Sequence, residues 1–209
     1  MKIICFDVNG TLVEESPWDA FNLKGEAKEN FKKVFNDFYE NKIGVDFLWK
    51  EVVSVLKKDG KGSKEYILNS SNPLKHLKEG AEDLIKYLKE KGYKIYLISC
   101  SIDIYLEKLC RVLLIDEFYA GTHFSFNGDD LITIESDCTE NNFKERKLKE
   151  LAEKEKIDPK EIFFVGDGSN DIGAFKLTGK GIAIDSNVAE LNDIAWRKIK
   201  RLEEIKNIL

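Results

Sequence analysis

Hydrophobic residues along the chain form short continuous runs that alternate with longer segments of helical periodicity. The runs end in turn residues and are typical of buried strands; they cover residues 3–6, 93–98, 162–165 and 181–184. One segment between them puts Leu84, Ile85 and Leu88 on a single helical face and stops at Gly92. Strands separated by helices of this length predict a doubly wound α/β fold, a parallel sheet with helices on both faces.

A β-hairpin interrupts this alternation. Residues 124–134 contain Asn127-Gly128 between two short β-rich runs, and this dipeptide favours a tight turn between antiparallel strands. We expect the hairpin to form an antiparallel flap at the edge of the sheet.

A longer interruption follows the first strand. Residues 13–75 contain no strong strand, and their apolar positions have helical spacing over 31–38 and again over 47–56. We therefore expect a small all-helical cap over 13–75, inserted in an α/β core formed by 1–12 and 76–209.

Composition narrows the class of protein. The 209 residues are 43% hydrophobic, enough to bury a full core in one domain that carries an insert. The net charge is −5 with acidic and basic residues interspersed, so nucleic acid is not an expected partner. No apolar run approaches the roughly 20 residues of a membrane span, and the first run is too short for a signal peptide. A soluble, cytoplasmic protein is expected.

The four cysteines are scattered, at Cys5, Cys100, Cys110 and Cys138, without a CxxC pair. This spacing favours reduced thiols over a disulfide framework or a zinc site.

Two candidate reactive groups follow the first two strand runs, where open α/β sheets bind ligands. Asp7 comes directly after the first run; taken alone, it is equally typical of a turn or a cap. Ser99 and Cys100 come after the second. A hydroxyl with backbone N–H groups at a helix start suits an anion, although serine is also a common N-cap.

Two more candidates lie in the C-terminal part. Lys144 begins the charged helix "FKERKLKELAEKEK", where Lys147 and Lys149 are alternatives and most lysines are expected to face solvent. In "FFVGDGSND", glycines flank Asp167, and Asp171 follows four residues later. Two carboxylates beside a flexible turn suit a hard cation such as Mg²⁺. Together the four segments indicate phosphoryl transfer, with a carboxylate attacking in line.

The four segments together resemble the haloacid dehalogenase superfamily of hydrolases. That family has an Asp-x-Asp-x-Thr motif, a Ser or Thr after a strand, a Lys, and GDGxND; here these are "DVNGT" at 7–11, Ser99, Lys144 and "GDGSND" at 166–171. The stretch 79–99 and the spacing from the lysine to the last motif are most similar to the phosphoserine phosphatase branch, and that spacing selects Lys144.

The resemblance implies an α/β core of the Rossmann type with a helical cap, and Mg²⁺-dependent hydrolysis of a small phosphorylated metabolite. It makes Asp7 the nucleophile that forms an aspartyl-phosphate. It places Mg²⁺ on the carboxylate of Asp7, the backbone carbonyl of Asn9 and Asp167, with Asp171 in support.

The same resemblance assigns the phosphate-binding groups. They are Ser99, the backbone N–H of Cys100, Lys144 and Asn170, with Thr11 shaping the first loop.

Asn9 departs from the family pattern, which has an Asp there to protonate the leaving group and activate water. An amide cannot transfer that proton, and general acid–base catalysis contributes about 10²–10⁴-fold. Mg²⁺ and phosphate binding are expected to survive better than turnover. Three explanations stay open. The protein hydrolyses slowly or acts on substrates with acidic leaving groups, such as aryl or acyl phosphates; it is a catalytically weak or inactive binding or regulatory module; or Asn9 is an engineered replacement of Asp that traps a complex.

The dehalogenase branch also lacks an Asp at this place, but it needs no metal. Because Asp167 and Asp171 are both present, a Mg²⁺–phosphate site is favoured over that chemistry.

The substrate grip of the phosphoserine-specific relatives is missing. They use a Glu shortly after the first motif, where this chain has Ser16 beside Glu14 and Glu15, and an Arg in the cap, where this chain has none. Lysine is not an equal clamp for a carboxylate, so phosphoserine is not the expected substrate.

Aromatic residues of the insert offer an alternative. Trp18, Phe21, Phe47 and Trp49 either line an apolar pocket for a larger ligand or, the more common arrangement for each, pack inside the cap.

Overall fold

The computed structural model describes residues 2–14, 18, 21–70, 73–138 and 142–209. The strands are β1 (Lys2–Phe6), β2 (Tyr93–Ile102), β3 (Glu117–Asn127), β4 (Asp130–Ser136), β5 (Ile162–Gly166), β6 (Gly181–Ile184) and β7 (Arg197–Ile199). The α-helices are α1 (Gly25–Tyr39), α2 (Val45–Lys58), α3 (Lys64–Ser70), α4 (Ala81–Glu90), α5 (Asp103–Leu113), α6 (Phe143–Glu155), α7 (Ile172–Thr178) and α8 (Ala189–Ile194). Within the described ranges, every helix is too short or too polar to cross a lipid bilayer.

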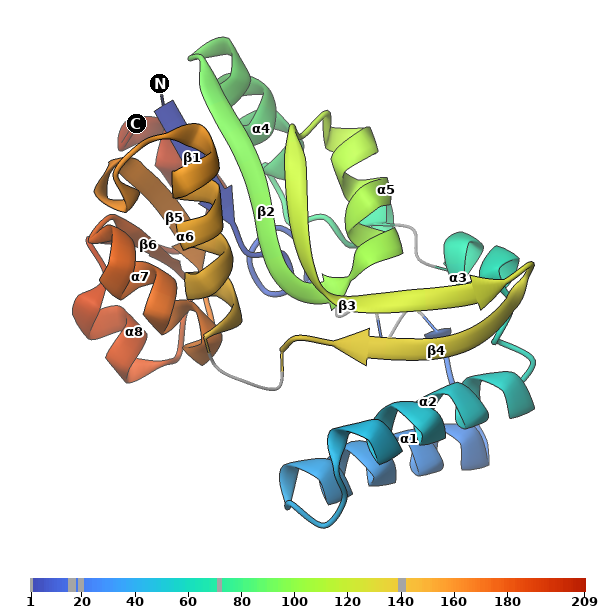
Figure 1. Ribbon diagram of the computed structural model, residues 1–209. Coiled ribbons are helices and arrows are strands. Elements are labelled where there is room, and N and C mark those ends of the chain that lie inside the picture. Colours follow the sequence, from blue (N-terminus) through green and yellow to red (C-terminus); the bar gives the residue numbers. More distant parts are fainter. Residues whose placement is uncertain (1, 15–17, 19–20, 71–72, 139–141) are drawn as a thin grey trace.

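One sheet organises the molecule. Among the described residues its strand order is β4-β3-β2-β1-β5-β6-β7 (Figure 1). All neighbouring strands run parallel except β3 and β4. The chain crosses from β2 and β3 on one side of β1 to β5 and β6 on the other, so the predicted doubly wound α/β fold is confirmed. The carboxyl ends of β1, β2, β5 and β6 therefore share one edge.

Side chains of β1 alternate between two buried layers. Ile4 and Phe6 belong to the cluster that includes residues of α4 and α5, while Ile3 and Cys5 belong to the cluster of α6 and α7. Helices thus cover both faces of the central strands (Figure 1). Burial on both faces explains why this strand is a continuous apolar run.

The predicted hairpin is present. Its first strand, β3, starts earlier than predicted, in a stretch that the sequence did not indicate as a strand. β3 ends at Asn127 and β4 begins at Asp130, with Gly128 at φ +61° in the turn. The first part of β3 pairs in parallel with β2, and the register of that pair shifts between Ser99 and Ile102. β2 therefore runs four residues beyond its predicted end at Ile98.

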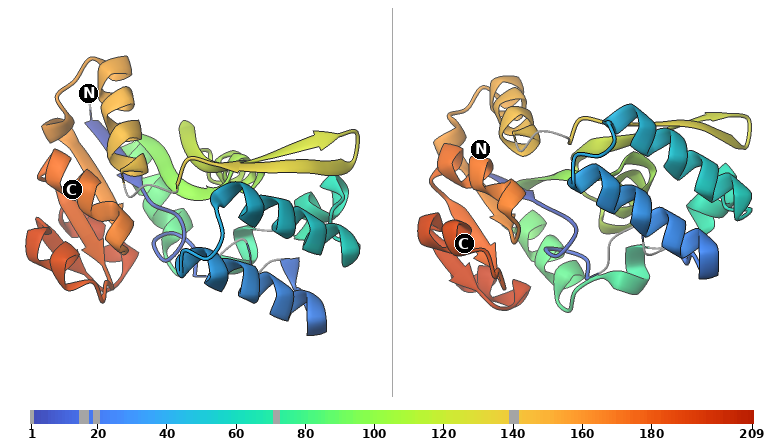
Figure 2. Two further views of the ribbon diagram at one scale, coloured as in Figure 1. Left: turned by 60° about the horizontal axis from the view of Figure 1, so that its bottom comes forward. Right: turned by 90° about the horizontal axis from the view of Figure 1, so that it is seen from below.

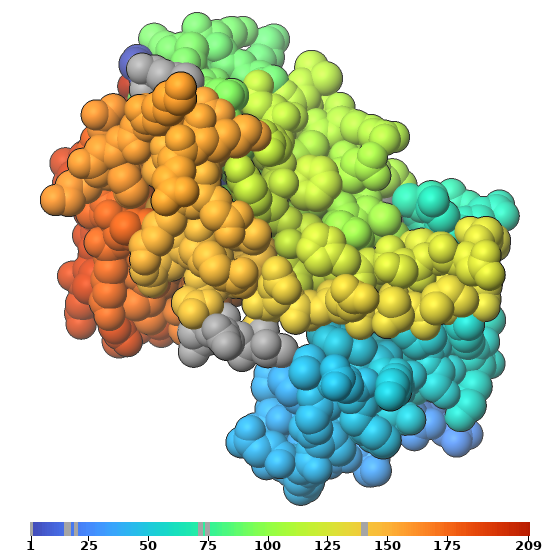
Figure 3. Space-filling model, viewed as in Figure 1, coloured from blue at the N-terminus to red at the C-terminus, as the bar shows by residue number. Residues whose placement is uncertain are grey.

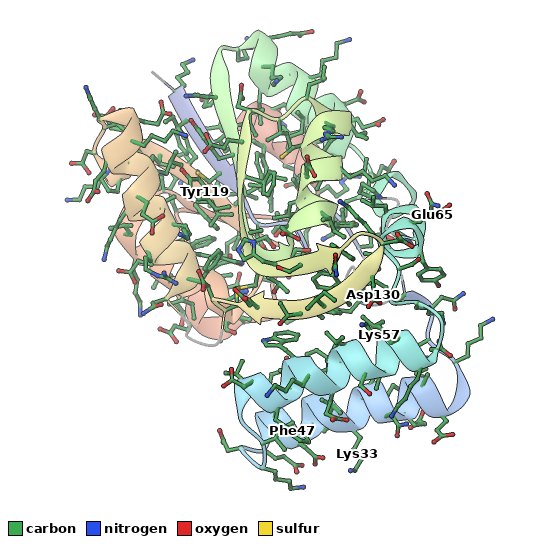
Figure 4. The ribbon with its side chains drawn as sticks, turned by 45° about the vertical axis from the view of Figure 1, so that its right-hand side comes forward. Lys33, Phe47, Lys57, Glu65, Tyr119 and Asp130 are labelled. Carbon is green, nitrogen blue, oxygen red and sulfur yellow. A yellow bond between two sulfur atoms is a disulfide. The ribbon has the colours of Figure 1, made fainter. Side chains whose placement is uncertain are left out.

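The inserted helices pack against this hairpin. Figure 2 shows α2 alongside the hairpin of β3 and β4, with α1 beside α2. Lys57 on α2 donates to Asp130 on β4 at 2.8 Å (Figure 4), and the backbone N–H of Leu131 donates to the carbonyl of Gly62 at 2.9 Å. The hairpin is therefore a support for the insert as well as a sheet edge. The predicted limits of the insert, 13–75, stay a prediction.

Candidate active site

The centre of the site is formed by three carboxylates at the ends of neighbouring strands. β1 delivers Asp7, whose backbone N–H continues the ladder to Val165 of β5 at 2.9 Å. Asp167 follows β5, and Asp171 lies at the start of α7. One oxygen of each carboxylate lies within 4.8 Å of the others. Pairing of β1 with β5 therefore brings together residues 160 positions apart in the sequence.

Lys144 reaches this cluster from the first turn of α6. Its side chain is 1% exposed, and its Nζ lies 3.0 Å from Asp7 Oδ1 and 2.5 Å from Asp171 Oδ1. Burial works against the charged amine, but the carboxylates of Asp171 and Asp7 outweigh it and raise the pKa of Lys144. The alternatives Lys147 and Lys149 form exposed pairs with glutamates on their own helix. Of these three lysines, only Lys144 contacts the carboxylate cluster.

The two carboxylates after β5 are held differently. Burial raises the pKa of Asp171 to about 6 in spite of Lys144, and its Oδ2 accepts from the backbone N–H groups of Asp167 and Gly168 at 3.0 and 2.9 Å. The pKa of Asp167 is raised by burial and by the charge of Asp7, while Thr11 Oγ1 donates to Asp167 Oδ1 at 2.9 Å. Burial is the main cause of both pKa shifts and the charge of Asp7 adds to it; a bound cation would favour the ionised form of both carboxylates.

Two glycines let the first loop approach the last motif. Gly10 has φ +78°, and a Cβ there would lie 2.2 Å from Asp167 Oδ2. A Cβ on Gly166 would lie 2.4 Å from Asp171 Oδ2. Any side chain at either place would push a carboxylate out of the cluster. Beside Gly10, the side-chain oxygen of Asn9 is buried, and no described residue donates a hydrogen bond to it.

This donor set fits a hard divalent cation. Mg²⁺ prefers a few carboxylate oxygens together with phosphate oxygens and water. Here one oxygen from each of the three carboxylates lies within 4.8 Å of the others. Both oxygens of Asp171 already accept from Lys144 or from backbone N–H groups. Asp7 and Asp167 are therefore better placed than Asp171 to coordinate a cation through their carboxylate oxygens.

Ser99 and Cys100 lie inside β2, not after it. Ser99 is buried at the register shift, and its Oγ accepts from the backbone N–H of Ser101 at 3.3 Å. The carbonyl of Cys100 accepts from Thr122 Oγ1 at 3.0 Å. The helix expected next, α5, begins at Asp103.

The expectation of reduced thiols is wrong for Cys100, which forms a disulfide with Cys138. The two residues are 38 positions apart, but the hairpin returns the chain to the end of β2 and brings their Cα atoms to 5.7 Å. Gly121 leaves room for the bond, since a Cβ there would lie 2.1 Å from Cys138 Sγ. Cys5 and Cys110 are buried free thiols, as expected. The spacing of cysteines in the sequence contains no sign of this return.

Reduction of this disulfide is expected to lower the free energy of unfolding by about 2–4 kcal/mol, because an unfolded chain without the crosslink gains loop entropy. Urea unfolding with and without dithiothreitol measures the difference. The Cys138→Ser variant is the control: it should start at the reduced value and no longer respond to reductant. Identical transitions for the oxidised and reduced protein would contradict the prediction.

A cavity of about 420 Å³ opens beside Lys144, between the core and the insert. Figure 3 shows the inserted helices (blue) standing apart from the surface formed by α6 and α7 (orange). The insert contributes mainly aromatic residues to the lining: Phe35, Phe38, Tyr39, Leu48 and Trp49. The core contributes mainly small or polar ones, among them Cys100, Thr122, Lys144, Ser169 and Asn170.

Only part of the predicted aromatic set faces this cavity. Trp49 lines it, while Trp18 stacks on Trp49 with ring centroids 5.9 Å apart and Phe21 is buried in the core. Phe47 is 52% exposed and is absent from the described lining (Figure 4). The substrate-grip positions Glu15 and Ser16 fall outside the described residues.

Two further contacts were not anticipated from the sequence. Ser186, which follows β6, donates from Oγ to the backbone carbonyl of Asp167 at 2.6 Å. The rule that polar residues after parallel strands meet at one edge could have found it. Lys78 donates from Nζ to the carbonyl of Gly10, and no local signal marks this lysine.

Comparisons with known proteins find matches over most of the chain. A family model described as haloacid dehalogenase-like hydrolase matches residues 1–179. The chain is 30% identical over 209 residues to the phosphoserine phosphatase of Methanocaldococcus jannaschii, covering 99% of this chain and 97% of that protein. A solved phospho-aspartyl intermediate analogue of phosphoserine phosphatase is 30% identical with a TM-score of 0.75, and a substrate-bound phosphoserine phosphatase is 28% identical with a TM-score of 0.76. Each of these two alignments covers 100% of this chain and 98% of the other.

Proposed function

We propose, because this chain belongs to the haloacid dehalogenase-like hydrolases, that it is a Mg²⁺-dependent phosphomonoester hydrolase acting through an aspartyl-phosphate on Asp7. Its substrate is a small phosphorylated metabolite. The observation that supports this most is the buried contact of Lys144 with Asp7 and Asp171, beside a third carboxylate on Asp167.

Asp7 has the position of a nucleophile. It is 5% exposed at the end of the central strand, so its carboxylate is fixed by the sheet. In the first step a carboxylate oxygen attacks phosphorus, and the bond from phosphorus to the ester oxygen breaks with its electrons on that oxygen. In the second step water attacks phosphorus, and the bond from phosphorus to the Asp7 oxygen breaks with its electrons on the carboxylate. The proton that water loses passes to solvent, and phosphate leaves.

Lys144 and the end of β2 hold the phosphate. The ammonium group has three donors, and two are directed at Asp7 and Asp171; the third is available to a phosphate oxygen. Ser99 Oγ, the backbone N–H of Cys100 and Asn170 complete the group. Thr11 holds Asp167 in place through its hydrogen bond at 2.9 Å.

Mg²⁺ would be held by the carboxylates of Asp7 and Asp167 and the backbone carbonyl of Asn9, with Asp171 in support. When bound, it offsets charge on the phosphoryl oxygens. Asn9 supplies its carbonyl whatever its side chain, so the metal site tolerates the amide.

The insert acts as a cap over the phosphate site. Helices α1 and α2 face the core across the cavity that Lys144 lines. We assign this cap to residues 13–75 and the hydrolase core to 1–12 and 76–209.

Release of phosphate from acetyl phosphate in the presence of Mg²⁺ tests the proposal. EDTA is expected to abolish release of phosphate and excess Mg²⁺ to restore it, because two of the proposed metal ligands, Asn9 and Asp167, lie on either side of the reacting carboxylate of Asp7. The control is EDTA already saturated with Mg²⁺. Halide release from 2-haloacids that persists in EDTA would indicate a dehalogenase. Binding of phosphate without turnover of acetyl phosphate or p-nitrophenyl phosphate would indicate a binding module.

A further inference from the structure

We propose that the preferred substrates are aryl phosphates, phosphate monoesters of uncharged phenols. This inference rests on the proposed phosphatase function and names the substrate class of the same site. Three observations support it: the charge of the cavity lining, the aromatic wall of the insert, and the amide at Asn9.

The described lining lacks partners for an amino acid. Among the residues that the structure places around the cavity there is no carboxylate, histidine or arginine. Lys144 is the one lysine of that lining, and it already contacts Asp7 and Asp171. The ammonium and carboxylate groups of a zwitterion would lose water there without gaining an opposite charge, which is unfavourable. An uncharged group avoids this loss.

The insert instead presents aromatic rings. Phe35 and Trp49 meet edge to face with centroids 6.1 Å apart, and Tyr39 lies beside Phe35 with a centroid distance of 6.4 Å. Tyr39 is 73% exposed although it lines the cavity. A ligand ring that covers Tyr39 would remove apolar surface from water and add an aromatic contact.

The leaving group must depart without help from Asn9. The carboxamide has no proton to transfer, and the neighbouring acids are engaged: Asp7 as nucleophile, Asp167 with Thr11, and Asp171 with Lys144. When Asp7 attacks, the bond from phosphorus to oxygen therefore breaks to give an oxyanion, which takes its proton from water afterwards. A phenol, with a pKa near 10 as in tyrosine, forms that anion far more readily than an alkyl alcohol.

The test compares phenyl phosphate, phosphoserine and acetyl phosphate with the unmodified protein in Mg²⁺. We expect kcat/KM for phenyl phosphate to exceed that for phosphoserine by about 10²-fold or more, the order that general acid catalysis would otherwise supply. The Tyr39→Ala variant should lower the ratio of phenyl phosphate to acetyl phosphate activity by about 3- to 10-fold, the worth of one aromatic pair. Tyr39→Phe should restore the ratio.

Phe47→Ala is the matched control, an exposed aromatic on the neighbouring helix α2 that does not line the cavity. It should change neither the phenyl phosphate nor the acetyl phosphate activity. Phosphoserine hydrolysis equal to or faster than phenyl phosphate hydrolysis, or a Tyr39→Ala ratio equal to that of Phe47→Ala, would overturn the inference. Failure to release phosphate from any of the three substrates would instead overturn the proposed phosphatase function. The comparison of substrates needs no variant, so it stands if Tyr39→Ala does not fold.

Discussion

Asp7→Asn is expected to abolish phosphate release, with kcat lower by about 10⁴-fold or more, the order of loss seen when a covalent nucleophile is removed. An amide has nearly the shape of the carboxylate but too little charge and nucleophilicity to attack phosphorus. The fold should be kept, because Lys144 retains its contact with Asp171 at 2.5 Å. The Asp7→Asn variant should therefore lose activity while its stability stays close to that of the unmodified protein.

Initial rates with acetyl phosphate measure the loss. Mass spectrometry of the acid-quenched protein shows whether a phosphoryl group is attached, and Asp7→Asn should show none. Asp185→Asn is a suitable control, since Asp185 follows the nearby strand β6 but forms an exposed pair with Lys200. Such pairs contribute little, so its rate should match the unmodified protein. A rate for Asp7→Asn within tenfold of that control would refute the role of nucleophile.

The core of the fold and the position of the carboxylates could be predicted from the sequence because both follow local rules. Apolar runs buried on both faces identify parallel strands. The topology then puts the residues after them at one edge, as it does for Asp7 and Asp167. The family resemblance selected Lys144 from three lysines, and only this one of the three is buried against the cluster.

The wall of the cavity could not be predicted in the same way. Phe47 and Trp49 are two residues apart on α2, about 200° around the helix axis, and only the packing of α2 on the hairpin decides which one faces the core. That packing depends on contacts between distant segments, such as Lys57 with Asp130. The disulfide of Cys100 with Cys138 depends on the same hairpin. Periodicity within a segment carries no information on either.

Asn9→Asp is expected to raise kcat/KM for alkyl phosphates by about 10²–10⁴-fold, the usual contribution of a general acid and base. The side-chain oxygen of Asn9 is buried without a donor among the described residues. A carboxylic acid of the same shape would fit there, and burial near Asp7 and Asp167 favours its protonated form. It could therefore give a proton to the leaving oxygen and take one from the attacking water.

The gain should depend on the leaving group. For phosphoserine departure of the leaving group gains, so kcat/KM rises. For p-nitrophenyl phosphate only the attack of water on the aspartyl-phosphate gains, so any increase should appear in kcat and not in kcat/KM. Asn9→Ala, which keeps the backbone carbonyl but has no polar side chain, is the control and should give no gain on either substrate. Calorimetric titration with Mg²⁺ should give similar affinities for the unmodified protein and Asn9→Ala, because the proposed ligand is the backbone carbonyl. An equal rate for Asn9→Asp and the unmodified protein on phosphoserine would mean that proton transfer is not what this site lacks. The limit would then lie in how the cap, with its aromatic wall and no arginine, receives an amino acid.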